Sequence, residues 1–360
     1  MENNNLHEKY IKTCFELAQK GKGAVSPNPL VGAVIVKNDK IISTGYHMKP
    51  GENHAEREAI LQSKVDLKDA TLYCNLEPCN HSNKQTPPCV PLIIESGISR
   101  VVVSNLDPNP EVNGKGIKEL RAAGVEVTTG VLEKEGSKLN KFFFKHIKTK
   151  LPYITVKIAL TLDGFIAEEF NKQTWITSEC AKKHVHKLRS EYDAVLIGAN
   201  TVNIDNPELT VRLTEGRNPL RVILDANLIS GTNQKIFDTT IAETWLFSSA
   251  NLNEAKKELL KKKNVKVFEL KKNEKNLLDL KEVLKILGDK NITSVLVEGG
   301  GEIFTQFVDN SLFDELLLLK APKIFGRGIP ALNLIEPPAL DLESVEIFEQ
   351  DIGITYLKKS

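Results

Sequence analysis

Several features are scarce in this 360-residue chain, and each scarcity excludes a class of protein. No apolar run reaches the ~18–20 residues needed to span a bilayer, so the sequence predicts no transmembrane helix. The net charge is only +1, from 48 Lys and Arg against 47 Asp and Glu, without the basic excess of a general nucleic-acid binder. Aromatic residues make up 6% and are not interleaved with basic ones, as a nucleic-acid-binding surface requires.

Cysteine is also scarce, and the number present, five, is odd. The start of the sequence, residues 1–5, lacks the basic end and the apolar stretch of a signal peptide. We therefore expect a soluble, cytoplasmic protein that makes no membrane contact. In such a protein, five cysteines argue against a disulfide framework and for metal or catalytic use of some of them. The five are Cys14, Cys74, Cys79, Cys89 and Cys180.

The chain does contain enough apolar material, 41% of its residues, for two sizeable cores. A single core rarely exceeds about 250–300 residues, so two domains are expected. Strand-like and helical patterns alternate up to residue 148, and a Lys-rich stretch followed by Pro152 predicts a boundary near residue 150. We expect α/β domains at residues 1–150 and 151–360. The first has 21 basic and 17 acidic residues, and the second has 27 and 30.

Local signals predict several elements. Residues 31–36 and 41–46 are β-rich runs that predict a hairpin. Residues 71–76 predict a strand, and Pro78 is placed to begin a helix, which would stabilise a Cys79 thiolate through the helix dipole. Residues 131–148 are expected to be helical. His184 and His186, two residues apart, are expected to be exposed helix residues and not a second metal site.

One imidazole and two thiols form the candidate metal ligands: His54, Cys79 and Cys89. Zinc takes such ligands, and three of them leave the fourth tetrahedral position for a water whose pKa falls toward ~7. Glu56, two residues after His54, is the candidate that carries protons to the leaving group. The order H-x-E, then P-C, then a further Cys is typical of zinc-dependent nucleobase deaminases. We expect one zinc ion per chain.

The residues leave alternatives open. In one alternative to a catalytic zinc site, Cys79 and Cys89 are plain buried cysteines. In another, they are ligands of a closed structural zinc site, with His81 as its fourth ligand. A zinc deaminase that acts on nucleic acid is another alternative, although the near-neutral charge counts against it. Cys14 and Cys74 lie on apolar faces and are expected in the core, and Cys180 has no visible metal partner.

Residues 1–148 resemble the deaminase half of the bifunctional riboflavin-biosynthesis deaminase–reductase family. The matching motifs are Pro27-Asn28-Pro29, Gly45-Tyr46-His47, His54-Ala55-Glu56, Leu76-Glu77-Pro78-Cys79 and Thr86-Pro87-Pro88-Cys89. The resemblance implies a cytidine-deaminase-like three-layer α/β/α domain that removes a ring amino group of a diaminopyrimidinone ribosyl phosphate as ammonia. It implies substrate contacts for Asn28, His47 and His81. The loop before Thr86 lacks the family's usual Gly, and Lys84 or Gln85 would replace its basic residue.

A second motif, Val297-Glu298-Gly299-Gly300-Gly301, follows a β-rich run and precedes a helical pattern. A strand, glycines and a helix in this order can present backbone N–H groups to a phosphate. The motif is not G-x-G-x-x-G, however, so the pattern does not indicate a Rossmann dinucleotide site, and a plain turn is the alternative.

From Tyr153 to its end, the chain resembles the family's reductase half, which has a dihydrofolate-reductase-like α/β fold. The matching motifs include Trp175-Ile176-Thr177-Ser178, Leu209-Thr210-Val211-Arg212 and the glycine motif. The resemblance implies hydride transfer from NADPH, with NADH not excluded, which opens the ribosyl group to a ribityl chain. It implies cofactor contacts for Ala159, Trp175, Thr201, Asp205, Gly299, Gly300 and Gly301. It implies substrate contacts for Gln173, Arg189, Leu209, Arg212 and Glu298.

Some roles in this half have a structural alternative. Arg189 and Arg212 would suit a phosphate ester, because guanidinium groups bind it in bidentate fashion, but a surface ion pair is the alternative. Lys157 is a candidate proton or orientation group, or else part of a structural ion pair.

This half also departs from the family at positions that bear on activity. Gln173 stands where Ser is usual, and Ala226 and Ile229 stand where Ser and Arg are usual, which would weaken the hold on a 2′-phosphate. An active deaminase fused to a degraded reductase is therefore a further alternative. The resemblance also implies a homo-oligomer that acts on a small molecule and binds no nucleic acid.

Overall fold

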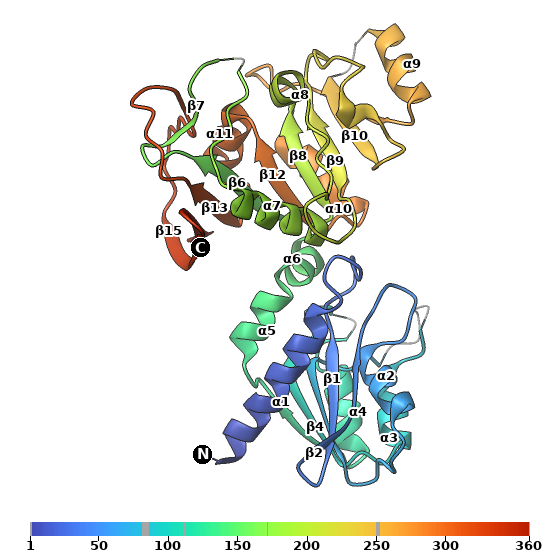
Figure 1. The fold of residues 1–360 in the computed structure, drawn as a ribbon. Coiled ribbons are helices and arrows are strands. Elements are labelled where there is room, and N and C mark those ends of the chain that lie inside the picture. The colour runs from blue at the N-terminus through green and yellow to red at the C-terminus, as the bar shows by residue number, and fades with distance from the viewer. Residues whose placement is uncertain (1, 81–85, 111, 171, 250–252, 360) are drawn as a thin grey trace. The chain divides into compact units, whose positions relative to one another are not determined.

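The computed structural model describes residues 2–80, 86–110, 112–170, 172–249 and 253–359. The chain divides into two compact units, Met1–Lys150 and Leu151–Ser360, here called the N-terminal and C-terminal units (Figure 1). Within the described ranges, no helix combines the length and the apolar character that crossing a membrane requires.

The N-terminal unit is built on a five-stranded sheet in the order β2-β1-β3-β4-β5. Strand β1 pairs antiparallel with β2 and β3, and β3, β4 and β5 are parallel, so the hairpin predicted at residues 31–46 is confirmed. The strands are β1 (Gly32–Lys37), β2 (Lys40–Tyr46), β3 (Thr71–Leu76), β4 (Arg100–Asn105) and β5 (Glu126–Thr129).

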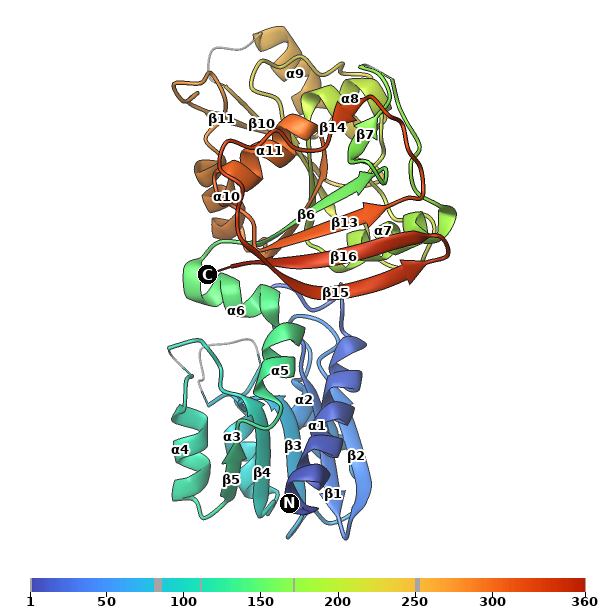
Figure 2. The ribbon, with the colours of Figure 1, turned by 90° about the vertical axis from the view of Figure 1, so that its left-hand side faces the viewer.

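Helices cover both faces of this sheet, which gives three layers (Figure 2). They are α1 (Glu2–Gln19), α2 (Ala55–Gln62), α3 (Cys89–Glu95), α4 (Lys115–Ala122), α5 (Glu133–Leu139) and α6 (Lys141–Thr149). Ile60 of α2, Ile93 of α3 and Leu120 of α4 share one core. Ile11 and Phe15 of α1 belong to a second core on the opposite face. Cys74 lies in the first core and Cys14 in the second, as predicted for these two cysteines.

The helical stretch predicted at residues 131–148 is confirmed, but it consists of two helices, α5 and α6, which meet at Asn140. The Asn140 amide accepts a hydrogen bond from Leu30 N at 2.8 Å and donates one to Leu30 O at 2.9 Å. Asn75 donates to the same carbonyl at 2.8 Å. These buried amides satisfy the backbone N–H and C=O groups of Leu30, in the segment that follows Asn28. The break at Asn140 therefore goes with long-range hydrogen bonds, which local helix propensity does not predict.

The C-terminal unit contains a nine-stranded sheet in the order β11-β10-β9-β8-β12-β6-β13-β16-β15. The seven strands from β11 to β13 are parallel, and β16 and β15 are added antiparallel at one edge. Its strands are β6 (Tyr153–Leu160), β8 (Ala194–Gly198), β9 (Leu220–Leu224), β10 (Thr244–Ser249), β11 (Lys266–Leu270), β12 (Ser294–Gly299), β13 (Glu315–Lys320), β15 (Leu340–Phe348) and β16 (Asp351–Lys358). Two further strands, β7 (Phe165–Ala167) and β14 (Ile329–Pro330), form a small separate pair.

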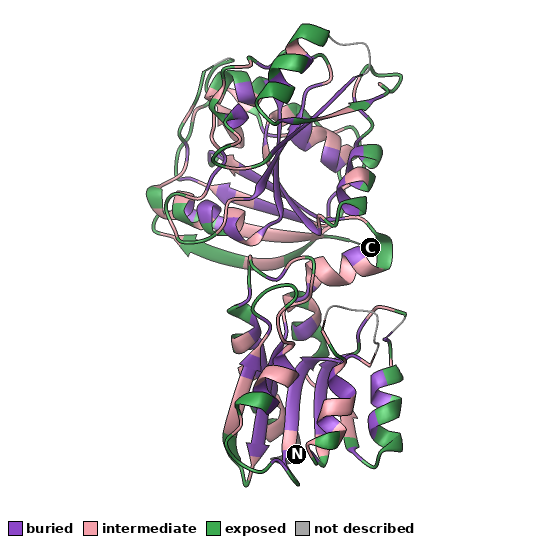
Figure 3. Cartoon of the chain, turned by 90° about the vertical axis from the view of Figure 1, so that its right-hand side faces the viewer, coloured by how far each residue is buried: buried purple, intermediate pink, exposed green. Residues whose placement is uncertain are grey.

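Both faces of the parallel part of this sheet are buried (Figure 3). On β8, Leu196 belongs to a core shared with α10 and α11, whereas Val195 and Ile197 belong to the core under α8 and α9. Such two-sided burial is expected where crossover helices cover a parallel sheet. The helices are α7 (Glu179–Glu191), α8 (Ala199–Asp205), η1 (Lys235–Phe237), α9 (Glu254–Lys262), α10 (Leu280–Asp289) and α11 (Gly301–Asp309). Ligands of open α/β sheets bind beyond the carboxyl ends of the strands, where α8 and α11 begin.

Candidate functional site

Three side chains from separate segments converge in the N-terminal unit. His54 precedes α2, Cys79 follows β3, and Cys89 begins α3. His54 Nδ1 lies 3.3 Å from Cys79 Sγ and 3.5 Å from Cys89 Sγ, and the three ligand atoms lie within 4.8 Å of one another. Zn–S bonds of about 2.3 Å and Zn–N bonds of about 2.0–2.1 Å in a tetrahedron separate N and S by about 3.6 Å. The donor set and its spacing therefore fit a zinc ion.

The local backbone differs from the prediction at Cys79. This residue is not in the first turn of a helix, and α3 begins at Cys89 with Pro88 as its N-cap residue. The Cys79 carbonyl accepts the backbone N–H groups of Cys89 at 3.0 Å and Val90 at 3.1 Å. It thereby satisfies two of the donors that every helix start leaves without an intrahelical acceptor. Pro88 takes the place that we had predicted for Pro78.

The two thiols and the imidazole favour an ionised sulfur. A hydrogen bond from the Cys89 thiol, the largest cause, and the nearby His54 together lower the pKa of Cys79 to about 4, against the effect of burial. A thiolate is the form that binds metal.

Glu56 lies in the first turn of α2, and it is only 3% exposed. Burial raises the pKa of its carboxyl group to about 7, His54 opposes this rise, and Cys79 adds to it. A carboxyl group with a pKa near the working pH can both accept and release a proton. The structure therefore places a buried carboxyl group that could carry protons beside the candidate metal ligands.

Asn28 and His47 lie next to the ligand cluster. Asn28 Nδ2 is 3.1 Å from His47 Nε2, and His47 Nδ1 is 3.1 Å from the Asn53 carbonyl oxygen. Because a carbonyl only accepts, Nδ1 carries the proton and Nε2 accepts from the Asn28 amide. The His47 ring meets His54 edge-on, with centroids 5.5 Å apart. His81, Lys84 and Gln85 lie outside the described residues.

Two supporting residues carry no role in our sequence analysis. Thr86 Oγ1 lies 3.0 Å from His54 Nε2, so it accepts the ring N–H once Nδ1 binds a metal, and this orients the ring. Glu77 is buried, and its carboxylate accepts the backbone N–H groups of Gly114 at 2.9 Å and Asp107 at 3.2 Å. Both residues belong to the sequence motifs that contain the cysteine ligands, but their hydrogen-bond partners are seen only in the folded structure.

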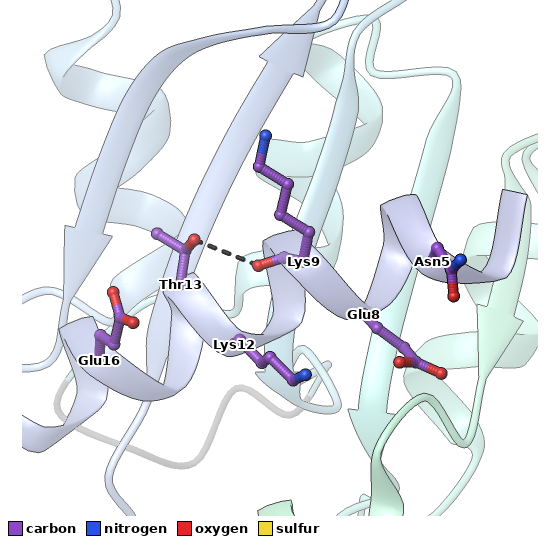
Figure 4. A pocket seen from close by; sticks show the side chains of 6 residues that line it. All are labelled: Asn5, Glu8, Lys9, Lys12, Thr13 and Glu16. Carbon is purple, nitrogen blue, oxygen red and sulfur yellow. Dashed lines mark hydrogen bonds between the residues drawn. The ribbon is translucent and has the colours of Figure 1, made fainter. Parts of the chain in front are cut away.

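A hollow of about 500 Å³ lies along the outer face of α1 (Figure 4). Its lining comes from that single helix: Asn5, Glu8, Lys9, Lys12, Thr13 and Glu16. Thr13 Oγ1 donates to the Lys9 carbonyl within the helix at 3.2 Å. No second element supplies a described wall, so we assign no site there.

In the C-terminal unit, three charged side chains meet in a buried position. Arg189 of α7 donates to Glu298 of β12 through Nε at 2.6 Å and through Nη2 at 2.9 Å. Lys157 Nζ of β6 lies 3.5 Å from the same carboxylate. Burial alone would raise the pKa of Glu298, but Arg189 and Lys157 outweigh burial and hold it at about 2. Burial lowers the pKa of Lys157, and Glu298 works against this.

The segment between α8 and β9 approaches this cluster. Arg189 Nη1 donates to the Thr210 carbonyl at 3.3 Å, and the Arg212 backbone N–H donates to His186 Nδ1 at 2.9 Å. Leu209 has a φ of 52°, which is rare for a bulky residue and is found at sites that the surrounding structure holds in place. The Arg212 side chain is 51% exposed, and its Nη1 bonds Glu208 Oε2 at 2.8 Å.

The prediction that His186 is exposed is wrong, because this side chain is 6% exposed. The helix α7 faces the sheet and the segment that carries Arg212, and His186 lies on the covered side. His184 is half-buried, with its ring centroid 4.5 Å from that of Phe348. Neither histidine belongs to a group of potential metal ligands among the described residues.

The glycine motif packs against Thr201 of α8. A Cβ atom on Gly299 would lie 2.9 Å from Thr201 Cγ2, and Gly300 has a φ of 89° that glycine adopts readily. Gly301 begins α11. The structure thus brings four of the predicted cofactor-binding residues together at the ends of β8 and β12.

Four other predicted residues of this unit differ in their exposure to solvent. Ala159 is half-buried on β6, and Asp205 ends α8 with a pKa raised by burial. Trp175 is 64% exposed, its ring lies 4.4 Å from Lys182 Nζ, and Gln173 is also exposed.

Comparison with known proteins matches each of the two units to a protein-family model. Residues 4–105 match the family model of the cytidine and deoxycytidylate deaminase zinc-binding region. Residues 152–354 match the RibD C-terminal domain. Together with the ligand cluster, these matches define a class, a zinc-binding deaminase joined to a reductase domain in one chain.

Full-length relatives identify the family. A riboflavin biosynthesis protein RibD from Bacillus amyloliquefaciens is 42% identical over 98% of this chain and 97% of its own length. One from Aquifex aeolicus is 45% identical over 90% of this chain and 89% of its own length. The chain belongs to the RibD family and is a bifunctional deaminase and reductase.

Solved structures agree with both α/β domains. The crystal structure of a diaminohydroxyphosphoribosylaminopyrimidine deaminase/5-amino-6-(5-phosphoribosylamino)uracil reductase from Thermotoga maritima has a TM-score of 0.87 and is 38% identical, covering 99% of this chain and 100% of its own. Acinetobacter baumannii RibD has a TM-score of 0.89 and is 31% identical, with the same coverage. The cytidine-deaminase-like and dihydrofolate-reductase-like domains that we expected are confirmed.

The zinc content offers a direct test of the ligand cluster. We expect about one zinc ion per chain in purified protein, measured by plasma mass spectrometry. Cys89→Ala should lose most of this zinc, because it removes one of three ligands. Cys74→Ala, the same change at another buried cysteine, should retain it. A full zinc content in Cys89→Ala would remove Cys89 from the ligand set.

Proposed function

We propose that the chain catalyses two consecutive steps of riboflavin biosynthesis. The N-terminal unit would deaminate 2,5-diamino-6-ribosylamino-4(3H)-pyrimidinone 5′-phosphate by hydrolysis, and the C-terminal unit would then reduce the ribosyl group to a ribityl chain with NADPH. The observation that carries this proposal is the cluster of His54, Cys79 and Cys89 beside the buried Glu56. The full-length similarity to RibD proteins supports both the substrate and the order of the steps.

In the deaminase step, His54, Cys79 and Cys89 would hold a zinc ion, which supplies a Lewis acid for the activation of water. The water oxygen bonds the ring carbon that carries the amino group, while a proton of the water passes to the Glu56 carboxylate, which delivers it to the amino nitrogen. The C–N bond then breaks, ammonia leaves, and the oxygen from water remains on the ring as a carbonyl. Asn28 and His47 would orient the pyrimidinone, because an amide and an imidazole can pair with the polar edges of a heterocycle.

In the reductase step, the pentose gains a hydride at C1 and a proton at the ring oxygen, so the ring opens. Bound NADPH supplies the hydride. The binding site for NADPH would be formed by Thr201, Asp205, Ala159, Trp175 and the glycines Gly299–Gly301. Lys157 is the proposed proton donor, because its buried ammonium group has a lowered pKa. Glu298 would orient Lys157 and Arg189 through the ion pairs described above.

The substrate of this step would lie over the segment from Leu209 to Arg212. Arg189 already bonds Glu298 and Thr210, whereas the half-exposed guanidinium of Arg212 is well placed to bind the phosphate ester. Gln173 and Leu209 would contact the rest of the substrate. The preference for NADPH over NADH and the homo-oligomer rest on the family resemblance and stay predictions. The cytoplasmic location rests on the sequence pattern alone and also stays a prediction.

Arg212→Ala tests the separation of the two sites. The substitution should raise the KM of the reductase step about 10- to 100-fold, because charge-assisted hydrogen bonds to the phosphate are lost. The rate of ammonia release should not change. Ammonia and the oxidation of NADPH are measured separately, with the diaminopyrimidinone ribosyl phosphate as substrate, and NADH is compared at equal concentration. An equal loss in both steps would contradict the two-site arrangement.

A further inference from the structure

We propose that His186 is a positioning residue of the reductase site, whose Nδ1 atom holds the backbone N–H of Arg212 and so fixes the segment that binds the substrate's phosphate. This inference rests on the proposed function of the C-terminal unit, and neither the motifs nor the comparisons assign a role to His186.

The helix α7 presents His186 and Arg189 on the same side, since residues three apart are neighbours on a helix surface. Both reach the segment from Glu208 to Arg212. His186 Nδ1 lies 2.9 Å from Arg212 N, and Arg189 Nη1 lies 3.3 Å from the Thr210 carbonyl. Arg189 also binds Glu298 of β12, so α7 connects this segment to the buried ion-pair cluster.

The segment depends on such contacts because residues 206–212 form no regular secondary structure. Backbone polar groups without a helix or sheet partner need side chains or water. Here Val211 N donates to Asn218 Oδ1 at 2.8 Å, and the Glu208 carbonyl accepts from Arg221 Nη1 at 3.3 Å. Leu209, with a φ of 52°, lies between these attachment points. The conformation at Leu209 therefore persists only while the surrounding side chains hold the backbone.

Four side chains thus support the segment: His186, Arg189, Asn218 and Arg221. Among them, only an imidazole changes its charge between mildly acidic and neutral pH. Imidazole Nδ1 accepts a hydrogen bond only while that nitrogen carries no proton. The contact with Arg212 N therefore requires neutral His186.

The charges that face His186 come from three elements: Arg189 of α7, Arg212 of the segment and Glu298 of β12. Burial, the largest cause, and the two arginines together lower the pKa of His186 from 6.5 to about 4, against the opposing effect of Glu298. In the folded chain His186 is therefore neutral, and the contact present, well above pH 4, and the contact is lost as the pH falls through about 4. The stability that the neutral imidazole contributes is fully present above about pH 6.5, the unfolded value, and declines as the pH falls from there toward 4.

Two substitutions separate the hydrogen bond from mere packing. His186→Leu keeps an apolar side chain but removes the acceptor. His186→Asn places an amide oxygen the same number of bonds from Cα as Nδ1, so it can still accept from Arg212 N, and it does not titrate. His184→Leu, on the same helix and packed on Phe348, is the matched control.

The test measures KM and kcat of the reductase step on the deaminated substrate with NADPH. Near neutral pH, His186→Leu should raise KM about tenfold with kcat nearly unchanged, which corresponds to about 1.4 kcal/mol. His186→Asn and His184→Leu should stay within about twofold of the unmodified chain. The ratio of the KM of the unmodified chain to that of His186→Asn should rise as the pH falls through about 4. The ratio is used because protonation of the substrate's phosphate, with a pKa of about 6, affects both proteins equally. Ammonia release from the N-terminal unit monitors folding of the rest of the chain.

An unchanged KM in His186→Leu would overturn the proposal. So would equal damage in the Leu and Asn variants, or a loss of kcat and thermal stability at normal KM, because each indicates a purely structural role. Hydrogen exchange of residues 209–212 gives a second reading that needs no turnover, and it should be faster in His186→Leu only. If the unmodified chain does not reduce the deaminated substrate, the proposed function fails, and hydrogen exchange alone still decides whether His186 holds the segment.

Discussion

Replacing Glu56 with glutamine should lower the rate of ammonia release by about 10²–10⁴-fold, the usual contribution of general acid–base catalysis. The amide keeps the size and position of the carboxyl group but can neither take a proton from water nor deliver one to the leaving nitrogen. Glu56 is not among the three candidate metal ligands, so the zinc content should be unchanged. Ammonia release and zinc content are measured on the same preparation.

Glu58→Gln is the matched control for this prediction, because Glu58 lies on the same helix and its Oε2 accepts a hydrogen bond from Asn53 Nδ2 at 3.1 Å. It should deaminate at nearly the normal rate. Reduction of the deaminated substrate should survive in both variants, since that chemistry takes place in the C-terminal unit. Normal ammonia release by Glu56→Gln would show that another group transfers the proton.

Replacing Glu298 with glutamine should destabilise the C-terminal unit by about 3–5 kcal/mol, the cost of removing one partner of a buried ion pair. The substitution leaves Arg189 and Lys157 buried without their common carboxylate. Burial already lowers the pKa of Lys157, so release of its proton offsets part of this cost. Reductase activity should fall sharply, because the proposed proton donor is no longer oriented or charged in the same way.

Denaturant unfolding of the C-terminal unit, followed by the fluorescence of its tryptophans, measures this effect. Glu302→Gln is the control, because Glu302 is exposed on the neighbouring helix α11 and should change stability little. The Glu298 pKa of about 2 lies below its ordinary 4.5, so its contribution to stability is present above about pH 4.5 and is lost as the pH falls toward 2. Equal stability of the two variants would show that the cluster does not support the fold.

Much of the fold follows from local patterns in the sequence. The two β-rich runs at residues 31–46 pair as the expected hairpin, and the central parallel strands of the C-terminal unit are apolar runs because both faces of that part of the sheet are covered. Long-range contacts overrule local propensity in a few places. The helical stretch predicted at residues 131–148 is divided in two at Asn140, whose amide bonds Leu30, a residue 110 positions earlier in the chain.

The candidate sites likewise contain residues that local sequence patterns reveal and contacts that only the folded structure reveals. His54, Cys79, Cys89 and Glu56 can be selected from the sequence, because ligand type, proton-carrying chemistry and short spacings are local properties. The partners of His186 cannot be selected in this way. An imidazole on an amphipathic helix gives no sign of what covers it, and we predicted that it was exposed. Its contact with Arg212 spans 26 residues and exists only once the segment after α8 packs onto α7.

The sequence by itself therefore determined the division into two α/β domains, the deaminase and reductase classes of their chemistry, and the candidate metal-ligating group. The tertiary structure decided which residues support that chemistry. It placed Cys89 and not Cys79 at a helix start, paired Arg189 with Glu298, and buried His186 against the backbone of Arg212. The physical reason is that burial and hydrogen-bond partners depend on elements far apart in the chain, whereas ligand chemistry belongs to each residue and its near neighbours.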